Sequence, residues 1–191
     1  MTISGILGIA AGVLGLAANP VYVADILRGD TKPSKSTWWM LTSLHVVLTA
    51  SYYASGARET LWLPIAYAIS FLVVAVLSIR YGEAGWRLTD TGCLMAVGCS
   101  GLLWWVARSP QLALLLTVCA DFFALIPTIE KAYARPWTEN RAAWLMASAA
   151  AALNVLAVET WTLSIAAYPA YVLAVNALIT LLIIRPRRVR A

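Results

Sequence analysis

Long apolar stretches alternate along this chain with short clusters of charged and turn-forming residues. A bilayer core about 30 Å thick needs roughly 20 apolar residues in a helix that crosses it. Seven stretches of this length are present, at about 3–27, 36–55, 60–80, 89–107, 111–133, 141–158 and 162–184. The pattern therefore predicts an all-α integral membrane protein with seven transmembrane helices and short connections between them.

The composition points to the same class. Of the 191 residues, 61% are hydrophobic and 12% are charged, whereas soluble domains carry about 25% charged residues. The connections are too short to hold a soluble domain, so we expect any function to lie within the membrane. The first stretch has no basic leader, which favours a retained helix over a cleaved signal peptide.

The basic residues segregate when successive connections are assigned alternately to the two sides of the membrane. Arg58 and Arg108 fall on one side. The other twelve of the fourteen fall on the opposite side: Arg28, Lys32, Lys35, Arg80, Arg87, Lys131, Arg135, Arg141, Arg185, Arg187, Arg188 and Arg190. Because basic residues concentrate on the cytoplasmic side, we predict an external amino terminus and a cytoplasmic carboxyl terminus in the plasma membrane, which is the inner membrane of a bacterium. This topology explains the net charge of +5 without a nucleic-acid partner.

The second half of the chain repeats the first. Residues 38–80 can be laid over residues 143–185 without gaps. The identical pairs include Trp39 and Trp144, Ser43 and Ser148, Pro64 and Pro169, and Arg80 and Arg185. The repeat predicts a first three-helix bundle at 1–83, a linker helix at 84–109 and a second bundle with a basic tail at 110–191. An odd linker helix lets both bundles enter the membrane in the same direction, as in parallel-repeat transporters.

This arrangement resembles the SWEET and PQ-loop superfamily of seven-helix (3+1+3) membrane transporters. The resemblance rests on the helix count, on a proline in the first and fifth stretches, and on the basic passages "KPSKST" and "RPWTEN". It implies two bundles that rock around a central cavity, with Pro20 and Pro127 as hinges. Asn19-Pro20 and Ile126-Pro127 stand where the family has a proline–glutamine pair. A proline within a helix also produces a static kink, so both interpretations of the two prolines stay open.

Two ionisable residues lie at the depth of the hydrocarbon core. Asp121 is near the middle of the fifth stretch, and His45, the single histidine, is at the centre of the second. A charged side chain at this depth costs about 2.5–3.5 kcal/mol on insertion scales, so such residues are functional candidates. A neutral Asp121 carries a proton that His45 can accept, and an ionised Asp121 can hold a cationic group. The alternative is that both side chains only join helices through hydrogen bonds.

Neutral polar and aromatic candidates accompany this pair. The amides of Asn19, Asn154 and Asn176 can bind hydroxyl or peptide-like groups, or can simply join helices through contacts worth about 0.6 kcal/mol each. The resemblance implies that Asn176 and the paired Trp39 and Trp144 surround the substrate. The two indoles are equally suited to anchor helix ends at the membrane surface.

These features favour a membrane transporter or facilitator of a small polar solute that works by alternating access and, as a hypothesis, is coupled to protons. A receptor or assembly protein on the same scaffold is the alternative. A membrane-embedded enzyme is less favoured, because no nucleophile stands beside a base. We expect no cofactor and no metal, since no second ligand is spaced for His45. Gly8 and Gly12 form a small-xxx-small motif that suits packing within one subunit or in a homo-oligomer.

Overall fold

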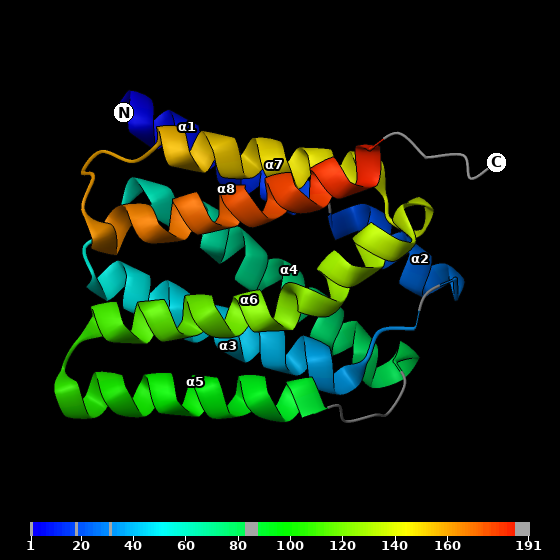
Figure 1. The fold of residues 1–191 in the computed structure, drawn as a ribbon, viewed down its shortest axis with the longest axis horizontal. Coiled ribbons are helices and arrows are strands. Elements are labelled where there is room, and N and C mark those ends of the chain that lie inside the picture. The colour runs from blue at the N-terminus through cyan, green and yellow to red at the C-terminus, as the bar shows by residue number, and fades with distance from the viewer. Residues whose placement is uncertain (1, 18, 31, 83–87, 186–191) are drawn as a thin grey trace.

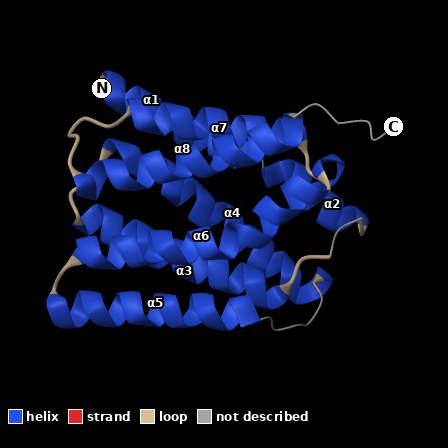
Figure 2. Ribbon diagram, in the orientation of Figure 1, coloured by secondary structure: helices blue, strands red, loops and turns tan. Residues whose placement is uncertain are grey.

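The computed structural model describes residues 2–17, 19–30, 32–82 and 88–185. Within these ranges the chain contains helices joined by turns and no strand (Figure 2). The prediction of an all-α chain is therefore confirmed.

The first part of the chain contains four helices and a 3₁₀ turn, and two of the helices end in the same way. These elements are α1 (Ile3–Ala17), α2 (Asn19–Arg28), α3 (Lys35–Ala54), η1 (Glu59–Leu61) and α4 (Trp62–Tyr81) (Figure 1). Gly29 follows α2 with φ of +83°, and Gly56 lies just after α3 with φ of +102°. The N–H of the next residue then reaches back five positions, from Asp30 to the carbonyl of Asp25 and from Ala57 to that of Tyr52. Glycine suits this Schellman motif because it adopts the left-handed backbone without a steric penalty.

The rest of the chain forms four further helices. These are α5 (Leu88–Ala107), α6 (Pro110–Ala134), α7 (Arg141–Leu156) and α8 (Leu163–Ile184), with the 3₁₀ turn η2 (Pro136–Thr138) before α7. The side chain of Asn140 begins α7 by accepting the N–H of Ala143 at 3.1 Å. Pro169 lies inside α8. Because proline has no N–H, the carbonyl of Ile165 one turn earlier loses its helical partner.

The helices form two sets with matching contacts. We call α1, α3 and α4 the amino-terminal set and α6, α7 and α8 the carboxy-terminal set. In the first set α4 contacts both α1 and α3, and in the second α8 contacts both α6 and α7. Between the sets, α1 contacts α7 and α3 contacts α6. Exchanging α1 with α6, α3 with α7 and α4 with α8 leaves this pattern unchanged, while α5 lies outside against α6 and α3 (Figure 1).

A shared core joins the two sets. One buried cluster contains Ala11 and Leu44 from the amino-terminal set and Leu114, Ala150 and Val172 from the carboxy-terminal set. Small side chains from α1 and α7 therefore meet larger ones from α3, α6 and α8. The two sets pack as one bundle rather than as separate domains.

The helix ends gather at two opposite ends of the bundle. In Figure 1, α1 begins at one end and α8 finishes at the other, which is also the end where α3 starts and where α4 and α6 finish. Basic residues mark this second end, among them Arg28, Lys35, Arg80, Arg141 and Arg185. Arg58 and Arg108 lie at the first end. Arg87 and the basic residues after 185 lie outside the described residues.

Four segments of the described chain are long and apolar enough to cross a membrane: Ile3–Arg28, Glu59–Tyr81, Pro110–Ala134 and Leu163–Ile184. The helix α7 is also apolar but has only 16 residues. Hydroxyl side chains and His45 interrupt the apolar residues of α3, which has 20 residues. These helices are compatible with a membrane location. The seven crossings drawn from the sequence stay a prediction, although each predicted stretch overlaps described helix.

Candidate functional site

Asp121 and His45 meet where the two helix sets adjoin. His45 belongs to α3 and Asp121 to α6, and these two helices pack against each other. The distance from Nε2 of His45 to Oδ1 of Asp121 is 3.9 Å. Both residues are buried, with exposed fractions of 3% for His45 and 8% for Asp121. The structure thus brings together the two ionisable residues that the sequence placed at mid-membrane depth.

Hydrogen bonds orient both side chains of this pair. Nδ1 of His45 lies 3.1 Å from the carbonyl oxygen of Leu41. A carbonyl oxygen can only accept, so Nδ1 carries the hydrogen and Nε2 of the neutral ring presents its lone pair to Asp121. The hydroxyl of Tyr171 donates to Oδ2 of Asp121 at 2.6 Å, a length typical of a hydrogen bond to a carboxylate.

The gap between His45 and Asp121 is suited to an added hydrogen-bond donor. A distance of 3.9 Å is too long for a direct hydrogen bond, which spans about 2.7–3.2 Å. With a neutral imidazole and an ionised carboxylate, two lone pairs face each other with no hydrogen between them. A relative movement of about 1 Å would let the two atoms share one proton. Whether the two side chains can share a proton therefore depends on the separation of α3 from α6, and a role in proton coupling stays a prediction.

Three tyrosines complete the surroundings of the pair, and none of them was among the predicted site residues. Besides Tyr171, the hydroxyl of Tyr67 on α4 interacts with the side chain of Asn176, whose amide donates to the carbonyl of Val172 at 2.9 Å. Tyr168 is 1% exposed, and its hydroxyl has no partner among the described residues. It lies within electrostatic range of Asp121. Tyrosines favour membrane surfaces, so a tyrosine far from a helix end is the signal that would have found Tyr171.

Aromatic rings form the wall of the site on the amino-terminal set. The ring of His45 lies perpendicular to that of Phe71, with centroids 4.6 Å apart. Phe71 also stacks on Tyr67 at 6.0 Å and meets the edge of Trp38 at 5.6 Å. Trp38 in turn contacts Tyr22 of α2 at 5.3 Å. The rings run from the buried pair toward the basic end of the bundle, where α2 ends and α3 begins.

The other predicted asparagines lie apart from this pair. Asn19 of α2 donates to the carbonyl of Ser70 at 3.5 Å. Asn154 on α7 is fully buried, and neither atom of its amide has a partner among the residues that the structure describes. Asn176 is the asparagine that belongs to the site, through Tyr67.

The two aligned tryptophans have different surroundings. Trp39 is 42% exposed, so its indole lies at the surface of the bundle. Trp144 is half-buried, and its Nε1–H donates to the carboxylate of Glu139 at 3.0 Å. Its backbone carbonyl accepts the hydroxyl of Thr180 at 3.1 Å. Neither indole is shown against Asp121 or His45 in the described contacts, and their role toward a substrate stays a prediction.

The two predicted hinge prolines lie in α2 and α6. Pro20 follows Asn19 at the beginning of the described part of α2. Residue 18, between α1 and α2, lies outside the described residues. Pro127 lies within α6, which bends along its length (Figure 1), as helices with an internal proline do. The side chain of Pro127 is itself outside the described part.

Tyr52 closes the end of the bundle opposite to the basic end. Its hydroxyl donates to the carbonyl of Ile165 at 2.6 Å and accepts from the hydroxyl of Thr60 at 2.6 Å. The carbonyl of Ile165 is the one that Pro169 leaves without a helical partner, so a side chain of α3 replaces a backbone bond of α8. The rings of Tyr52 and Tyr168 lie 5.4 Å apart. Tyr52 therefore joins α3 of one helix set to α8 of the other.

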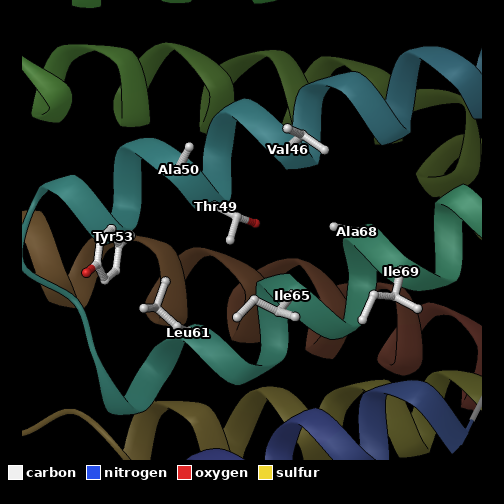
Figure 3. Close-up of a pocket in the computed structure, with 8 residues that line it drawn as sticks. All are labelled: Val46, Thr49, Ala50, Tyr53, Leu61, Ile65, Ala68 and Ile69. Carbon is white, nitrogen blue, oxygen red and sulfur yellow. The ribbon is translucent and has the colours of Figure 1, made fainter.

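An apolar groove of about 380 Å³ lies on the surface between α3 and α4 (Figure 3). Its lining residues are Val46, Thr49, Ala50, Tyr53, Leu61, Ile65, Ala68 and Ile69. The hydroxyl of Thr49 donates to the carbonyl of His45 at 2.7 Å, so it offers little to a polar ligand. The groove does not suit a polar solute.

No group of three or more metal-ligating side chains occurs among the described residues. No family model matches the chain, and no curated protein or solved structure is detectably similar to it. The resemblance to the SWEET and PQ-loop superfamily therefore rests on the sequence features alone.

Proposed function

We propose that this protein is a membrane carrier of a small polar solute and that its two helix sets move relative to each other to give alternating access. Seven helices would cross the membrane as 3+1+3, with α1 and α2 together as the first crossing and α5 as the linker. The matching contacts of the two sets support this proposal, because parallel repeats related by an axis along the membrane normal are a known transporter plan.

The observation that carries the proposal is the buried pair of Asp121 and His45. The two residues belong to different helix sets and lie 3.9 Å apart. Any movement of one set against the other changes this distance, and with it the ability of the two atoms to share a proton. Proton binding and the conformation of the carrier are then coupled, as alternating access driven by a proton gradient requires.

In this proposal the described conformation is closed at the end where Tyr52 binds Ile165. Opening that end requires the hydrogen bond to break, which returns the carbonyl of Ile165 to an unpaired state inside α8. The basic end is assigned to the cytoplasm on the positive-inside rule, and the amino terminus to the outside of the plasma membrane. The end closed by Tyr52 is then the external one.

Flux measurements on purified protein in proteoliposomes test the proposal. A thermal-shift screen against sugars, amino acids, amines and vitamins at pH 6 and pH 8 first selects solutes, and their uptake is then measured with and without a pH gradient. We expect saturable uptake that depends on pH, and loss of this dependence in Asp121→Asn. Asp30→Asn is the matched control, because Asp30 is exposed and pairs with Arg28 at 3.2 Å.

Two outcomes would contradict the proposal. Uptake with an unchanged pH dependence in Asp121→Asn would remove the carboxylate from proton coupling. Absence of flux for every solute that binds, together with a tight peptide or lipid ligand, would instead indicate a receptor or assembly protein on this scaffold.

A further inference from the structure

The gap between Asp121 and His45 lies between two hydrogen-bond acceptors. Oδ2 of Asp121 is occupied by the hydroxyl of Tyr171 at 2.6 Å. Oδ1 faces Nε2 of His45 at 3.9 Å, and Nδ1 of the same ring is committed to the carbonyl of Leu41. When the imidazole is neutral and the carboxylate ionised, two acceptors thus face one gap, and the site needs a group that donates to both.

The width of this gap selects the kind of group that fits. A single proton cannot form a hydrogen bond across 3.9 Å, whereas one atom carrying two hydrogens can lie about 2.8 Å from both acceptors. Water and a primary ammonium group have this geometry. Only the ammonium group also neutralises the carboxylate, which reduces the cost of an unpaired charge at this depth.

The remaining groups around the gap also suit a cation. The hydroxyl of Tyr168, buried and without a partner among the described residues, lies within electrostatic range of Asp121 and offers another acceptor. The rings of Phe71 and Tyr67 stand beside His45, with centroids 4.6 and 6.2 Å from that of the imidazole.

The ionisable groups around Asp121 come from several helices. From α3 comes His45, from α8 come Tyr168 and Tyr171, and from α4 comes Tyr67. His45 is the one of these whose side chain becomes a cation when it takes up a proton. A proton taken up by the pair occupies the same acceptors that an ammonium group would use.

We propose that this site binds the ammonium group of a small primary amine, in competition with the proton shared by His45 and Asp121. The proposal deepens the proposed function and rests on it for one consequence, namely that the carrier exchanges an amine for a proton. Either ligand satisfies the two acceptors, and both cannot occupy the gap at once.

Binding to the purified full-length protein in detergent tests this inference without any measurement of transport. The probes are n-butylammonium, its neutral isostere 1-butanol, and tetramethylammonium, which has the charge but no N–H group. We expect saturable binding of n-butylammonium alone, measured by calorimetry and thermal shift. An alkylammonium ion remains charged at pH 6 and pH 8, so its affinity should rise with pH, by up to about tenfold per pH unit while one proton is displaced.

Variants separate the site from the rest of the protein. Asp121→Asn should reduce n-butylammonium affinity at least tenfold and remove its pH dependence, while Asp30→Asn should bind as the unmodified protein does. Tyr171→Phe keeps the carboxylate and should retain the pH dependence. Size-exclusion chromatography checks that each variant is folded. If Asp121→Asn does not fold, the three probes on the unmodified protein still decide the question.

Equal binding of 1-butanol, or of tetramethylammonium, would overturn the inference, because neither can bridge the two acceptors as a charged donor. Saturable binding of a sugar with no binding of n-butylammonium would also overturn it, yet would leave the carrier proposal intact. Binding of n-butylammonium without its flux in proteoliposomes would leave the site standing and contradict the carrier instead.

Discussion

The contact of α1 with α4 and the contact of α6 with α8 occupy equivalent places in the two helix sets, but they are built in opposite ways. In the first, glycines bring backbones together: a Cβ atom added to Gly12 would lie 2.9 Å from the carbonyl oxygen of Trp62 in α4, and one added to Gly8 would overlap that of Glu59 in η1, the turn that leads into α4. In the second, the carboxylate of Asp121 and the hydroxyl of Tyr171 meet at 2.6 Å.

The contact of α1 with α4 is therefore structural, whereas the contact of α6 with α8 contains the ionisable side chain of the candidate site. The helix α1 has no charged residue, and its glycine face fixes it closely against the start of α4. A contact of that kind gives the amino-terminal set little freedom to rearrange internally. The pair of α6 and α8 instead carries the buried charge, so the ionisable group lies on one side of an otherwise matching arrangement. The predictions below act on these two contacts and on the bonds that join the sets.

The largest effect is expected from Gly8→Ala. The added methyl group meets a backbone oxygen, which cannot move aside as a flexible side chain can. Overpacking of this kind costs about 1–3 kcal/mol, and we expect the upper end of that range. The measurement is the melting temperature and the unfolding free energy in detergent.

Gly98→Ala is the matched control for this change. Gly98 lies in α5, and nothing lies within 4 Å of a Cβ atom added there. Alanine favours a helix over glycine by about 1 kcal/mol, so this variant should be as stable as the unmodified protein or more so. Equal destabilisation by both substitutions would show that the glycine face does not hold α1 against α4.

The second prediction concerns Tyr171→Phe, which acts on the contact of α6 with α8. The change removes the donor to the carboxylate of Asp121 and leaves the ring in place. A hydrogen bond to a charged group is worth about 1.5–3 kcal/mol, and we expect a loss of about 2 kcal/mol in unfolding free energy. Tyr53→Phe, at an exposed tyrosine whose ring lies under Arg58, should change stability by much less.

The third prediction concerns the bond between the sets. Tyr52→Phe leaves the carbonyl of Ile165 without its donor, and we expect a cost of about 1.5 kcal/mol. Pro169→Ala returns a backbone N–H to that same carbonyl. The cost of Tyr52→Phe should therefore be smaller in the Pro169→Ala background, and a double-mutant cycle measures the difference. Strict additivity of the two changes would mean that Tyr52 does not replace the bond that the proline removes.

The long apolar stretches, bounded by charged or turn-forming residues, were sufficient to predict that the described chain is all-helical, whereas the seven membrane crossings stay a prediction. The approach of His45 to Asp121 was also within reach of the sequence, since two ionisable groups in apolar stretches have few other partners. The tyrosines around this pair could not be predicted from the sequence, because their contacts depend on how the helices are rotated against each other. The repeat identifies Pro169 as a matched position. The hydrogen bond from Tyr52 to the carbonyl of Ile165, which Pro169 leaves without a helical partner, joins residues more than a hundred positions apart and could not be predicted.

The aligned tryptophans also show that side-chain contacts could not be predicted from the sequence. Trp39 and Trp144 match in the sequence, yet one is exposed and the other donates to Glu139. Identity of residue type at matched positions thus does not fix the surroundings, because the partner helices present different side chains. A second matched pair allows this difference to be measured.

The smallest effect is expected at the matched serines of the two sets. Ser148 on α7 donates to the hydroxyl of Thr180 on α8 at 2.8 Å, since that hydroxyl gives its own hydrogen to the carbonyl of Trp144. Ser43 on α3 is exposed and bonds only to the carbonyl of Trp39 in its own helix, at 2.9 Å. A bond between membrane helices is worth about 0.6 kcal/mol, so Ser148→Ala should cost that amount.

Ser43→Ala should leave the unfolding free energy unchanged, because the bond that it removes joins no second helix. The comparison needs both variants in the same detergent, with unfolding followed by tryptophan fluorescence. A larger cost for Ser43→Ala than for Ser148→Ala would reverse the expected order. That result would mean that the exposed hydroxyl of Ser43 stabilises α3 more than the hydroxyl of Ser148 stabilises the contact of α7 with α8.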